Sequence, residues 1–240
     1  MTERGAADEP RRGIWAIVPI KSFDAAKKRL AGMLDAKERR ALMLAMARDV
    51  LTALCGSRRL AGVLIVSRSP EADALAESFG SARFQESESA DLPGALGEAA
   101  AHAALHYGAE GIFVVPADVP LIRAEEIDAL LERHRAVTVL PDRNRVGTNG
   151  LILSPHDAID FVFDGRSFRP HLEQARRAGL DPAVVHESGF DLDVDTPDDL
   201  GRLLRLGPNT QTGIFLERTG IAGRLPLASR PRHPGAACRD

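Results

Sequence analysis

Short apolar runs that alternate with amphipathic stretches constrain the fold of this chain more than any other feature. The runs are rich in β-branched residues and bounded by turn residues, which predicts buried strands. We expect strands at residues 14–20, 62–67, 82–85, 111–116, 136–140, 151–153 and 184–186. We expect helices at residues 37–54, 71–79, 96–107, 123–133 and 168–178, and another that begins at Thr196 and Pro197. This alternation predicts an α/β fold with a largely parallel sheet and helices on both faces.

The domain organisation follows from length and composition. With 240 residues, the chain is long enough for one large α/β domain or two small ones. The composition shifts from about Gly207, and the last residues mix arginines with prolines and glycines. We therefore expect a flexible N-terminus over residues 1–12, one domain over residues 13–222 and a flexible basic tail over residues 223–240.

Composition also excludes several classes of protein. The net charge of -3 gives no general attraction to nucleic acid or to an anionic membrane. No segment approaches the roughly 18 apolar residues of a membrane span. Cys55 and Cys238 lie far apart without a CxxC motif, which argues against a disulfide scaffold or a zinc site. With no secretory signal at the N-terminus, a cytoplasmic location is expected.

A cluster of cations follows the first predicted strand. Lys21, Lys27, Lys28 and Arg29 lie beyond its carboxyl end, which is the edge where open α/β sheets bind ligands. Four cations at this edge indicate a polyphosphate ligand. The alternative is a solvated basic loop, and the cluster alone does not decide between the two.

Carboxylates gather at two other places. Asp118 directly follows the strand at residues 111–116, so it should emerge at the same edge as the basic loop. Asp191, Asp193 and Asp195 alternate along an extended segment, and alternate side chains share a face. Clustered carboxylates repel unless a cation lies between them, and Mg²⁺ bound by carboxylates and substrate phosphates would satisfy both partners. The alternatives are a turn or helix cap at Asp118 and a solvated strand end at the other aspartates.

Two hydroxyl residues are candidates for binding an anionic acceptor. Thr148 lies in a turn-rich segment, residues 147–150, whose backbone amides point to the same role. Ser167 lies just before a predicted helix, where the helix dipole favours an anion. Ordinary turn chemistry for Thr148 and an ordinary N-cap for Ser167 are the alternatives.

Five motifs, in order, resemble those of the 2-phospho-L-lactate guanylyltransferase family of coenzyme F-420 biosynthesis. They are VPIK and KKRL in residues 18–30, PADVPL at 116–121, GTNG at 147–150, SFRPH at 167–171 and DVDTPDDL at 193–200. The resemblance covers about residues 14–220. It implies a single-domain, three-layer nucleotidyltransferase of the GT-A-like type with a mostly parallel mixed sheet. It also implies transfer of GMP from GTP to the phosphate of 2-phospho-L-lactate, phosphoenolpyruvate or 3-phospho-D-glycerate, with release of pyrophosphate.

The resemblance assigns roles residue by residue. Lys21, Lys28 and Arg29 match the phosphate-contacting loop, and Asp118 matches a metal-binding aspartate. Asp193 and Asp195 match positions that bind the metal, which is expected to be Mg²⁺. Thr148, Gly165 and Ser167 match positions that bind the phosphorylated acid. The glycine is shifted by one position, because this chain has Phe163-Asp164-Gly165 where relatives often have Phe-Gly. A downstream enzyme that consumes a labile product is implied, and a homodimer is compatible with the sequence.

Other functions remain open from the residues. Molybdenum-cofactor and sugar-phosphate nucleotidyltransferases usually have a glycine-rich loop after the first strand, where this chain has Pro19-Ile20-Lys21. A glycosyltransferase would carry a mid-chain DxD, and a dehydrogenase would carry GxGxxG after a strand. A non-catalytic nucleotide sensor would keep the basic loop but would not need the carboxylates. The residues alone do not choose GTP over another nucleotide, nor one acid among the three.

Overall fold

The computed structural model describes residues 12–20 and 27–226. Its centre is a seven-stranded sheet with the strand order β3-β2-β1-β4-β6-β5-β7. The strands are β1 (Gly13–Pro19), β2 (Gly62–Val66), β3 (Ala82–Phe84), β4 (Ala109–Val114), β5 (Val137–Pro141), β6 (Thr148–Leu153) and β7 (Ala183–Val184). All the neighbouring pairs are parallel except β4·β6 and β5·β6, because β6 runs opposite to the rest. The expected mostly parallel mixed sheet is therefore confirmed.

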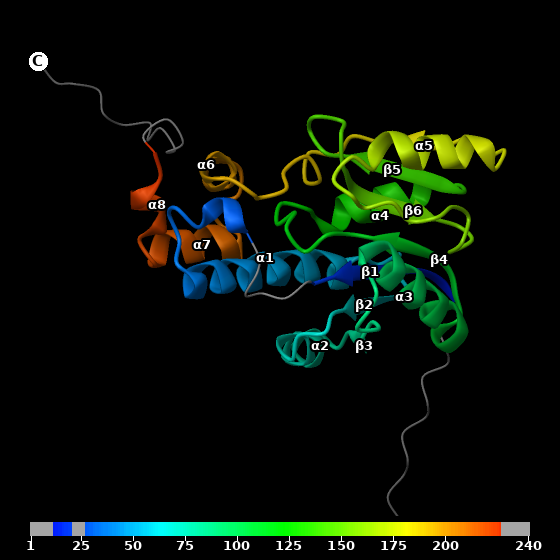
Figure 1. The fold of residues 1–240 in the computed structure, drawn as a ribbon, viewed down its shortest axis with the longest axis horizontal. Coiled ribbons are helices and arrows are strands. Elements are labelled where there is room, and N and C mark those ends of the chain that lie inside the picture. Colours follow the sequence, from blue (N-terminus) through cyan, green and yellow to red (C-terminus); the bar gives the residue numbers. More distant parts are fainter. Residues whose placement is uncertain (1–11, 21–26, 227–240) are drawn as a thin grey trace, which may run out of the picture.

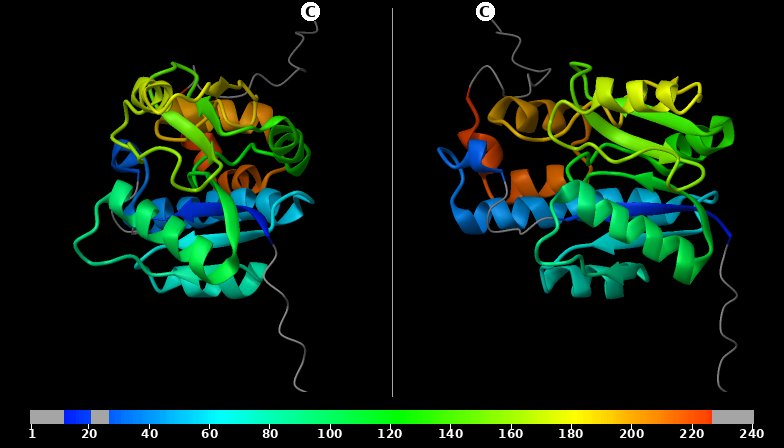
Figure 2. Two further views of the ribbon diagram at one scale, coloured as in Figure 1. Left: turned by 90° about the vertical axis from the view of Figure 1, so that its right-hand side faces the viewer. Right: turned by 45° about the vertical axis from the view of Figure 1, so that its right-hand side comes forward.

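Helices cover both faces of this sheet, as the views in Figure 1 and Figure 2 show. They are α1 (Ala36–Gly56), α2 (Glu71–Phe79), α3 (Leu92–Tyr107), α4 (Ala124–Arg133), α5 (Phe168–Arg177), α6 (Pro197–Leu206), α7 (Gln211–Arg218) and α8 (Ile221–Arg224), with a 3-10 turn, η2 (Lys28–Leu30). Figure 1 shows α6, α7 and α8 gathered at the left, on the side toward which β1 runs. None of the helices in the described ranges is both long and apolar enough to cross a bilayer.

The strand period of two divides the apolar residues between two cores. Ala16 and Val18 of β1 face a core shared with α1, α2, α4, α6, α7 and α8. Trp15 and Ile17 face the opposite core, which α3 and α5 cover. Small residues of α3, among them Ala99 and Ala103, are fully buried, so this helix approaches the sheet closely. The result is a three-layer α/β/α domain.

Local signals fix several helix ends. Asp35 caps α1 and forms a reciprocal capping box with Glu38. Thr196 caps α6, with Pro197 at the first helical position. Gly80 ends α2 in the left-handed conformation, at φ 61°. These polar contacts satisfy backbone groups that the helices leave unpaired at their ends.

One expectation about local structure is corrected. Residues 147–150 were expected to form a loop, but Thr148, Asn149 and Gly150 belong to β6 and are buried. Strand pairing explains this, because Thr148 lies opposite Pro141 and Gly150 opposite Leu140 of β5. Helices α7 and α8 were not predicted, and Leu225, beyond the expected boundary at residue 222, is only 1% exposed.

Helix α7 is held by a contact that a local pattern does not contain. The carboxylate of Asp49, in α1, accepts backbone hydrogen bonds from Gln211 and Thr212, each at 2.8 Å. Thr212 is fully buried. The first turn of α7 is therefore stabilised by a residue far away in the sequence.

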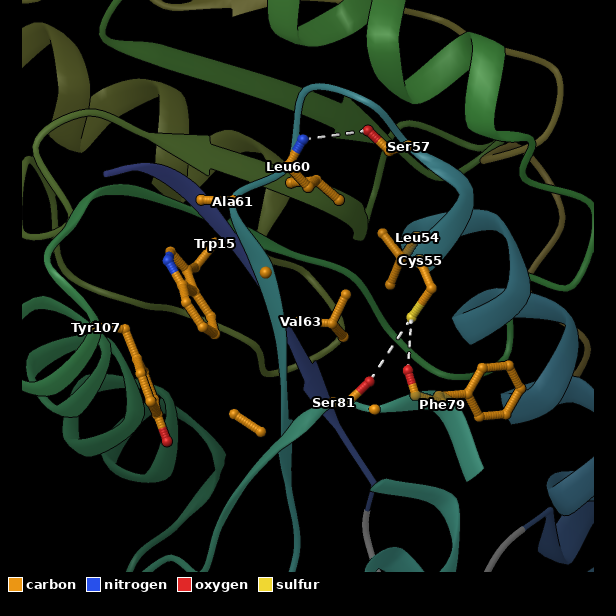
Figure 3. Close-up of a pocket in the computed structure, with 13 residues that line it drawn as sticks. Trp15, Leu54, Cys55, Ser57, Leu60, Ala61, Val63, Phe79, Ser81 and Tyr107 are labelled. Atoms are coloured by element: carbon orange, nitrogen blue, oxygen red, sulfur yellow. Dashed lines mark hydrogen bonds between the residues drawn. The ribbon is translucent and has the colours of Figure 1, made fainter. Parts of the chain in front are cut away.

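Close packing at the amino end of β1 and β2 requires a glycine. An added Cβ at Gly62 would lie 2.5 Å from the ring of Trp15. That ring cannot move away freely, because it stacks on Tyr107 with centroids 4.4 Å apart. Figure 3 shows the two aromatic side chains beside each other in this region. Gly62 is therefore required because any side chain at this position would clash with the Trp15 ring.

We predict that Gly62→Ala lowers the free energy of unfolding by about 1–3 kcal/mol, because the methyl group overpacks the Trp15 ring. The matched control is Gly97→Ala, in α3, where an added Cβ meets nothing within 4 Å. That change should raise stability by about 0.5–1 kcal/mol, as alanine favours the helix. Urea denaturation of both variants measures the difference. Equal effects of the two substitutions would contradict the packing argument.

Candidate active site

Four chain segments meet at one edge of the sheet. The parallel strands β1, β4 and β5 end there, and β6 begins there because it runs in the opposite direction. The edge therefore receives the segment after β1, the loop containing Asp118 after β4 and the loop of residues 142–147 between β5 and β6. Residues 190–196, which lead into α6, also lie at this edge. The Val194 backbone N–H donates to the Asp118 carbonyl at 3.0 Å and so ties this segment to the loop after β4.

Lys27 joins two of these segments through its side chain. Its Nζ lies 2.6 Å from Oδ2 of Asp118 and 2.7 Å from Oδ1 of Asp195. The Lys27 side chain is 5% exposed, whereas Asp118 is 26% and Asp195 39% exposed. Lys27 has a left-handed backbone conformation, at φ 54° and ψ 44°, which is uncommon outside glycine. Unusual backbone of this kind concentrates at functional sites.

The charges at this point are strongly coupled. Burial alone would lower the pKa of Lys27, but Asp118 and Asp195 outweigh it and raise that pKa above its ordinary value. Burial, and then the negative charges of Asp118 and Asp195, raise the pKa of Asp193. The site thus holds more negative charge than one lysine neutralises. It favours cations, as expected of carboxylates that share a metal or a phosphate-bound ion.

The donor set suits a hard divalent cation in type, since carboxylate oxygens are the ligands that Mg²⁺ prefers. As the side chains stand, however, no three His, Cys, Asp or Glu residues within 12–20 and 27–226 converge on one point that could hold a metal. The Lys27 ammonium lies where Asp118 and Asp195 both point. The two carboxylates are therefore arranged to hold a positive charge between them.

A cavity of about 460 Å³ opens beside the charged cluster. Its walls come from the loop after β5, the start of β6, the segment before α5 and the segment before α6. Its lining includes Arg29, Arg143, Thr148, Gly165, Ser167, Asp193 and Asp195. Two cations and several hydroxyl or backbone groups thus face the same space as four carboxylates, those of Asp142, Asp193, Asp195 and Asp199. A small polyanionic molecule in this cavity would therefore need a bound cation beside it.

The three residues predicted to bind the phosphorylated acid all line this cavity. Thr148 is 6% exposed, and its Oγ1 lies 3.0 Å from Nδ1 of His171. Gly165 has φ 86°, a backbone conformation that favours glycine. Ser167 is 1% exposed and precedes α5, but its side chain does not cap the helix. The role of Thr148, Gly165 and Ser167 as ligands of the acid stays a prediction.

The predicted basic residues fall into three groups. Lys21 lies outside the described residues. Lys28 is exposed, and its side chain makes no hydrogen bond or ion pair with a residue in the described part of the chain. Arg29 is 75% exposed, lines the cavity and places Nη1 3.7 Å from Oδ2 of Asp195. Lys27, rather than its neighbour Lys28, is the lysine that enters the site.

Three contributors escaped the sequence analysis. Lys27 was recognised only as part of the basic cluster. Asn149 was only part of a motif, yet its Nδ2 donates to the Phe190 carbonyl at 2.8 Å and lies 3.5 Å from Oδ1 of Asp193. Arg143 lines the cavity, whereas Arg166, next to Ser167, is exposed and does not. The basic run Asp142-Arg143-Asn144-Arg145 beside the GTNG motif was the available signal.

A second cavity, of about 430 Å³, lies at the amino ends of β1, β2 and β3, away from this edge. Trp15, Cys55 and Tyr107 are among its lining residues, and the Cys55 Sγ lies 3.7 Å from Oγ of Ser81 (Figure 3). Burial raises the pKa of the Cys55 thiol, so it is not an activated nucleophile. None of the predicted site residues lines this cavity.

Two buried histidines predict how stability depends on pH. Burial lowers the pKa of His134 and of His171 to about 4, with a minor lowering by Arg135 at His134 and an opposing effect of Asp164 at His171. In the unfolded chain each should titrate near 6.5. Between about pH 6.5 and pH 4 the unfolded state therefore binds protons that the folded state does not.

We accordingly expect the free energy of unfolding to fall by roughly 1–3 kcal/mol per histidine as the pH drops from 6.5 to 4. Urea titrations across this range measure the slope. Following the histidine C2 proton resonances by NMR measures the two pKa values directly in the folded protein. If both resonances titrate near pH 6.5, burial does not hold these rings neutral.

Comparison with known proteins identifies relatives over most of the chain. The profile of the family described as "Guanylyl transferase CofC like" matches residues 14–233. A phosphoenolpyruvate guanylyltransferase of Conexibacter woesei is 38% identical over 223 residues, covering 91% of this chain and 99% of that protein. A 2-phospho-L-lactate guanylyltransferase of Methanothermobacter thermautotrophicus is 35% identical, covering 85% of this chain and 89% of that protein.

Solved structures support the fold. A Desulfovibrio desulfuricans protein assigned as a nucleotide-diphospho-sugar transferase matches with a TM-score of 0.70 at 18% identity, covering 87% of this chain and 95% of that one. A nucleotidyl transferase from Methanothermobacter thermautotrophicus matches with a TM-score of 0.57 at 15% identity, covering 85% and 98%. With the family profile spanning nearly the whole described chain, this protein belongs to the CofC-like guanylyltransferase family.

Proposed function

We propose that the protein transfers the GMP group of GTP to the phosphate of a small phosphorylated carboxylic acid in coenzyme F-420 biosynthesis. The observation that carries the proposal is the junction of the Lys27–Asp118–Asp195 cluster with the cavity lined by Thr148 and Ser167. The cluster suits the triphosphate and its cation, and the cavity suits an acidic acceptor. Phosphoenolpyruvate is the first acid to test, because the 38% identical relative is named for it.

In the reaction, an oxygen of the acid's phosphate attacks the α-phosphorus of GTP. The bond from the α-phosphorus to the bridging oxygen breaks, and pyrophosphate leaves with that oxygen and its electron pair. Because the attacking group is already an anion, no general base is required. The protein's task is to align two polyanions and to neutralise the charge that builds up on the phosphoryl oxygens.

The residues divide this task between them. Lys27 places a positive charge beside Asp118 and Asp195, and Arg29 extends it to the rim of the cavity. Thr148 and Ser167 offer hydroxyl donors to the acid. Arg143 brings a cation to the same cavity, suited to the acid's carboxylate. The positive charges of these residues offset the repulsion between GTP and the acid, which the loss of surrounding water would otherwise strengthen.

Mg²⁺ is the proposed cofactor, held by Asp118 and Asp195 with Asp193 beside them. When bound, it would supply charge neutralisation to the phosphates of GTP. The Lys27 ammonium, now between two carboxylates, would then contact a phosphate oxygen in their place. Its position among the carboxylates supports a cation at this point but does not identify the metal.

The function is tested by incubating the protein with Mg²⁺, GTP and each of the three acids, with pyrophosphate release as the readout. We expect release with at least one acid, with loss of the reaction on adding EDTA. Because the product is expected to be labile, a downstream enzyme that consumes it should be present in a parallel assay. GTP binding without pyrophosphate release for any acid would favour a nucleotide sensor, and CTP used as well as GTP would argue against guanylyl transfer.

A matched pair of variants tests the role of the basic loop. We expect Lys27→Ala to lower kcat/KM by roughly 100-fold or more, the range seen when a preorganised charge is removed from a transition state. Lys28→Ala should change it by no more than about threefold, because exposed charges are screened by solvent. Steady-state kinetics with both substrates, beside thermal melting to check folding, makes the comparison. An equal loss in both variants would assign the catalytic role to Lys28 as well.

A further inference from the structure

His171 makes two hydrogen bonds that fix the position of its ring proton. The ring is fully buried at the start of α5. The Val162 backbone N–H lies 3.1 Å from Nε2 of His171, and Oγ1 of Thr148 lies 3.0 Å from Nδ1. A backbone N–H can only donate, so Nε2 must be the unprotonated, accepting nitrogen.

The ring proton of the neutral imidazole is therefore on Nδ1, and Nδ1–H donates to Oγ1 of Thr148. Burial keeps the ring neutral by lowering its pKa to about 4, although the negative charge of Asp164 acts in the opposite direction. The Phe163 ring packs edge-on against the imidazole, with centroids 5.1 Å apart. These contacts leave the ring one orientation and one tautomer.

This assignment has a direct consequence for Thr148. A hydroxyl has one hydrogen to donate and two lone pairs to accept with. His171 uses one lone pair, so the hydroxyl hydrogen is left for another acceptor. Thr148 makes no other side-chain hydrogen bond with the described residues, and it lines the cavity proposed for the acid.

We propose that His171 is a positioning residue that turns the Thr148 hydroxyl into a committed donor toward the phosphorylated acid. The inference rests on the proposed function, because the acid supplies the accepting oxygen. With the other tautomer, Thr148 would donate to His171 instead and present only lone pairs to an anion. His171 does not touch the substrate, and it acts through Thr148.

Two conservative variants separate this role from simple packing. His171→Asn can place an amide N–H near the position of Nδ1 and keep the donor to Thr148. His171→Gln can reach the position of Nε2 and keep the acceptor for Val162, but it loses the donor. With phosphoenolpyruvate as the probe, we expect His171→Gln to raise its KM about tenfold or more and His171→Asn to change it by less than about threefold. The KM for GTP should move by no more than about twofold in either variant.

A double-mutant cycle shows whether His171 acts through the hydroxyl. In a Thr148→Val background, His171→Gln should add no further increase in the KM for phosphoenolpyruvate, because no hydroxyl remains to be oriented. An equal rise in both backgrounds, or equal effects of the Asn and Gln variants, would overturn the proposal and leave His171 a packing residue.

The tautomer itself can be measured in the unmodified protein, which decides the matter even if the variants fail to fold. Imidazole ¹⁵N shifts should show Nδ1 protonated and Nε2 unprotonated near neutral pH. The reverse tautomer would overturn the proposal. An unmodified protein that releases no pyrophosphate with any acid would instead refute the proposed function, and the ¹⁵N shifts would still report on His171.

Discussion

The Lys27 ammonium between Asp118 and Asp195 is the interaction on which the rest of the site depends. It joins residues 91 and 168 positions apart in the chain. Without a positive charge at this point, three carboxylates would face one another at the edge of the sheet, and they would repel at short range in a partly desolvated place. A cation at this point, whether it comes from the chain or from solution, relieves that repulsion.

Neutral contacts hold the same segments together independently of that charge. The backbone bond from Val194 to Asp118 ties the segment before α6 to the loop after β4. The amide of Asn149 ties the start of β6 to the Phe190 carbonyl. Because these contacts do not involve the ammonium, Lys27 can exchange a carboxylate partner for a phosphate without dismantling the site.

Sequence periodicity predicted the strands and their order of appearance, because each strand is apolar over a length that only a buried strand explains. It also placed Asp118 and the basic loop at one edge, since parallel strands end on the same side. Periodicity missed features that depend on pairing between distant segments or on the backbone conformation of a single residue. Thr148 belongs to a strand only because β5 pairs with it.

The choice between adjacent lysines shows the same limit. Lys27 and Lys28 are identical in type and neighbours in sequence, and no period distinguishes them. The left-handed turn at Lys27 aims one side chain inward and leaves the next exposed. Similarly, α7 begins where Asp49 receives its backbone amides, a contact 162 residues away that composition cannot reveal. Patterns located the edge, while individual contacts decided which side chains occupy it.

The reversed direction of β6 has a consequence for how this family could diversify. Because β6 starts where β5 ends, the wall carrying Arg143, Thr148, Gly165 and Ser167 comes from one uninterrupted stretch of chain between β5 and α5. Lys27 and Asp118 come from earlier stretches, which follow β1 and β4. Under the proposed function, recombination or swapping of that single stretch would alter acceptor choice and leave the residues proposed to contact the triphosphate unchanged.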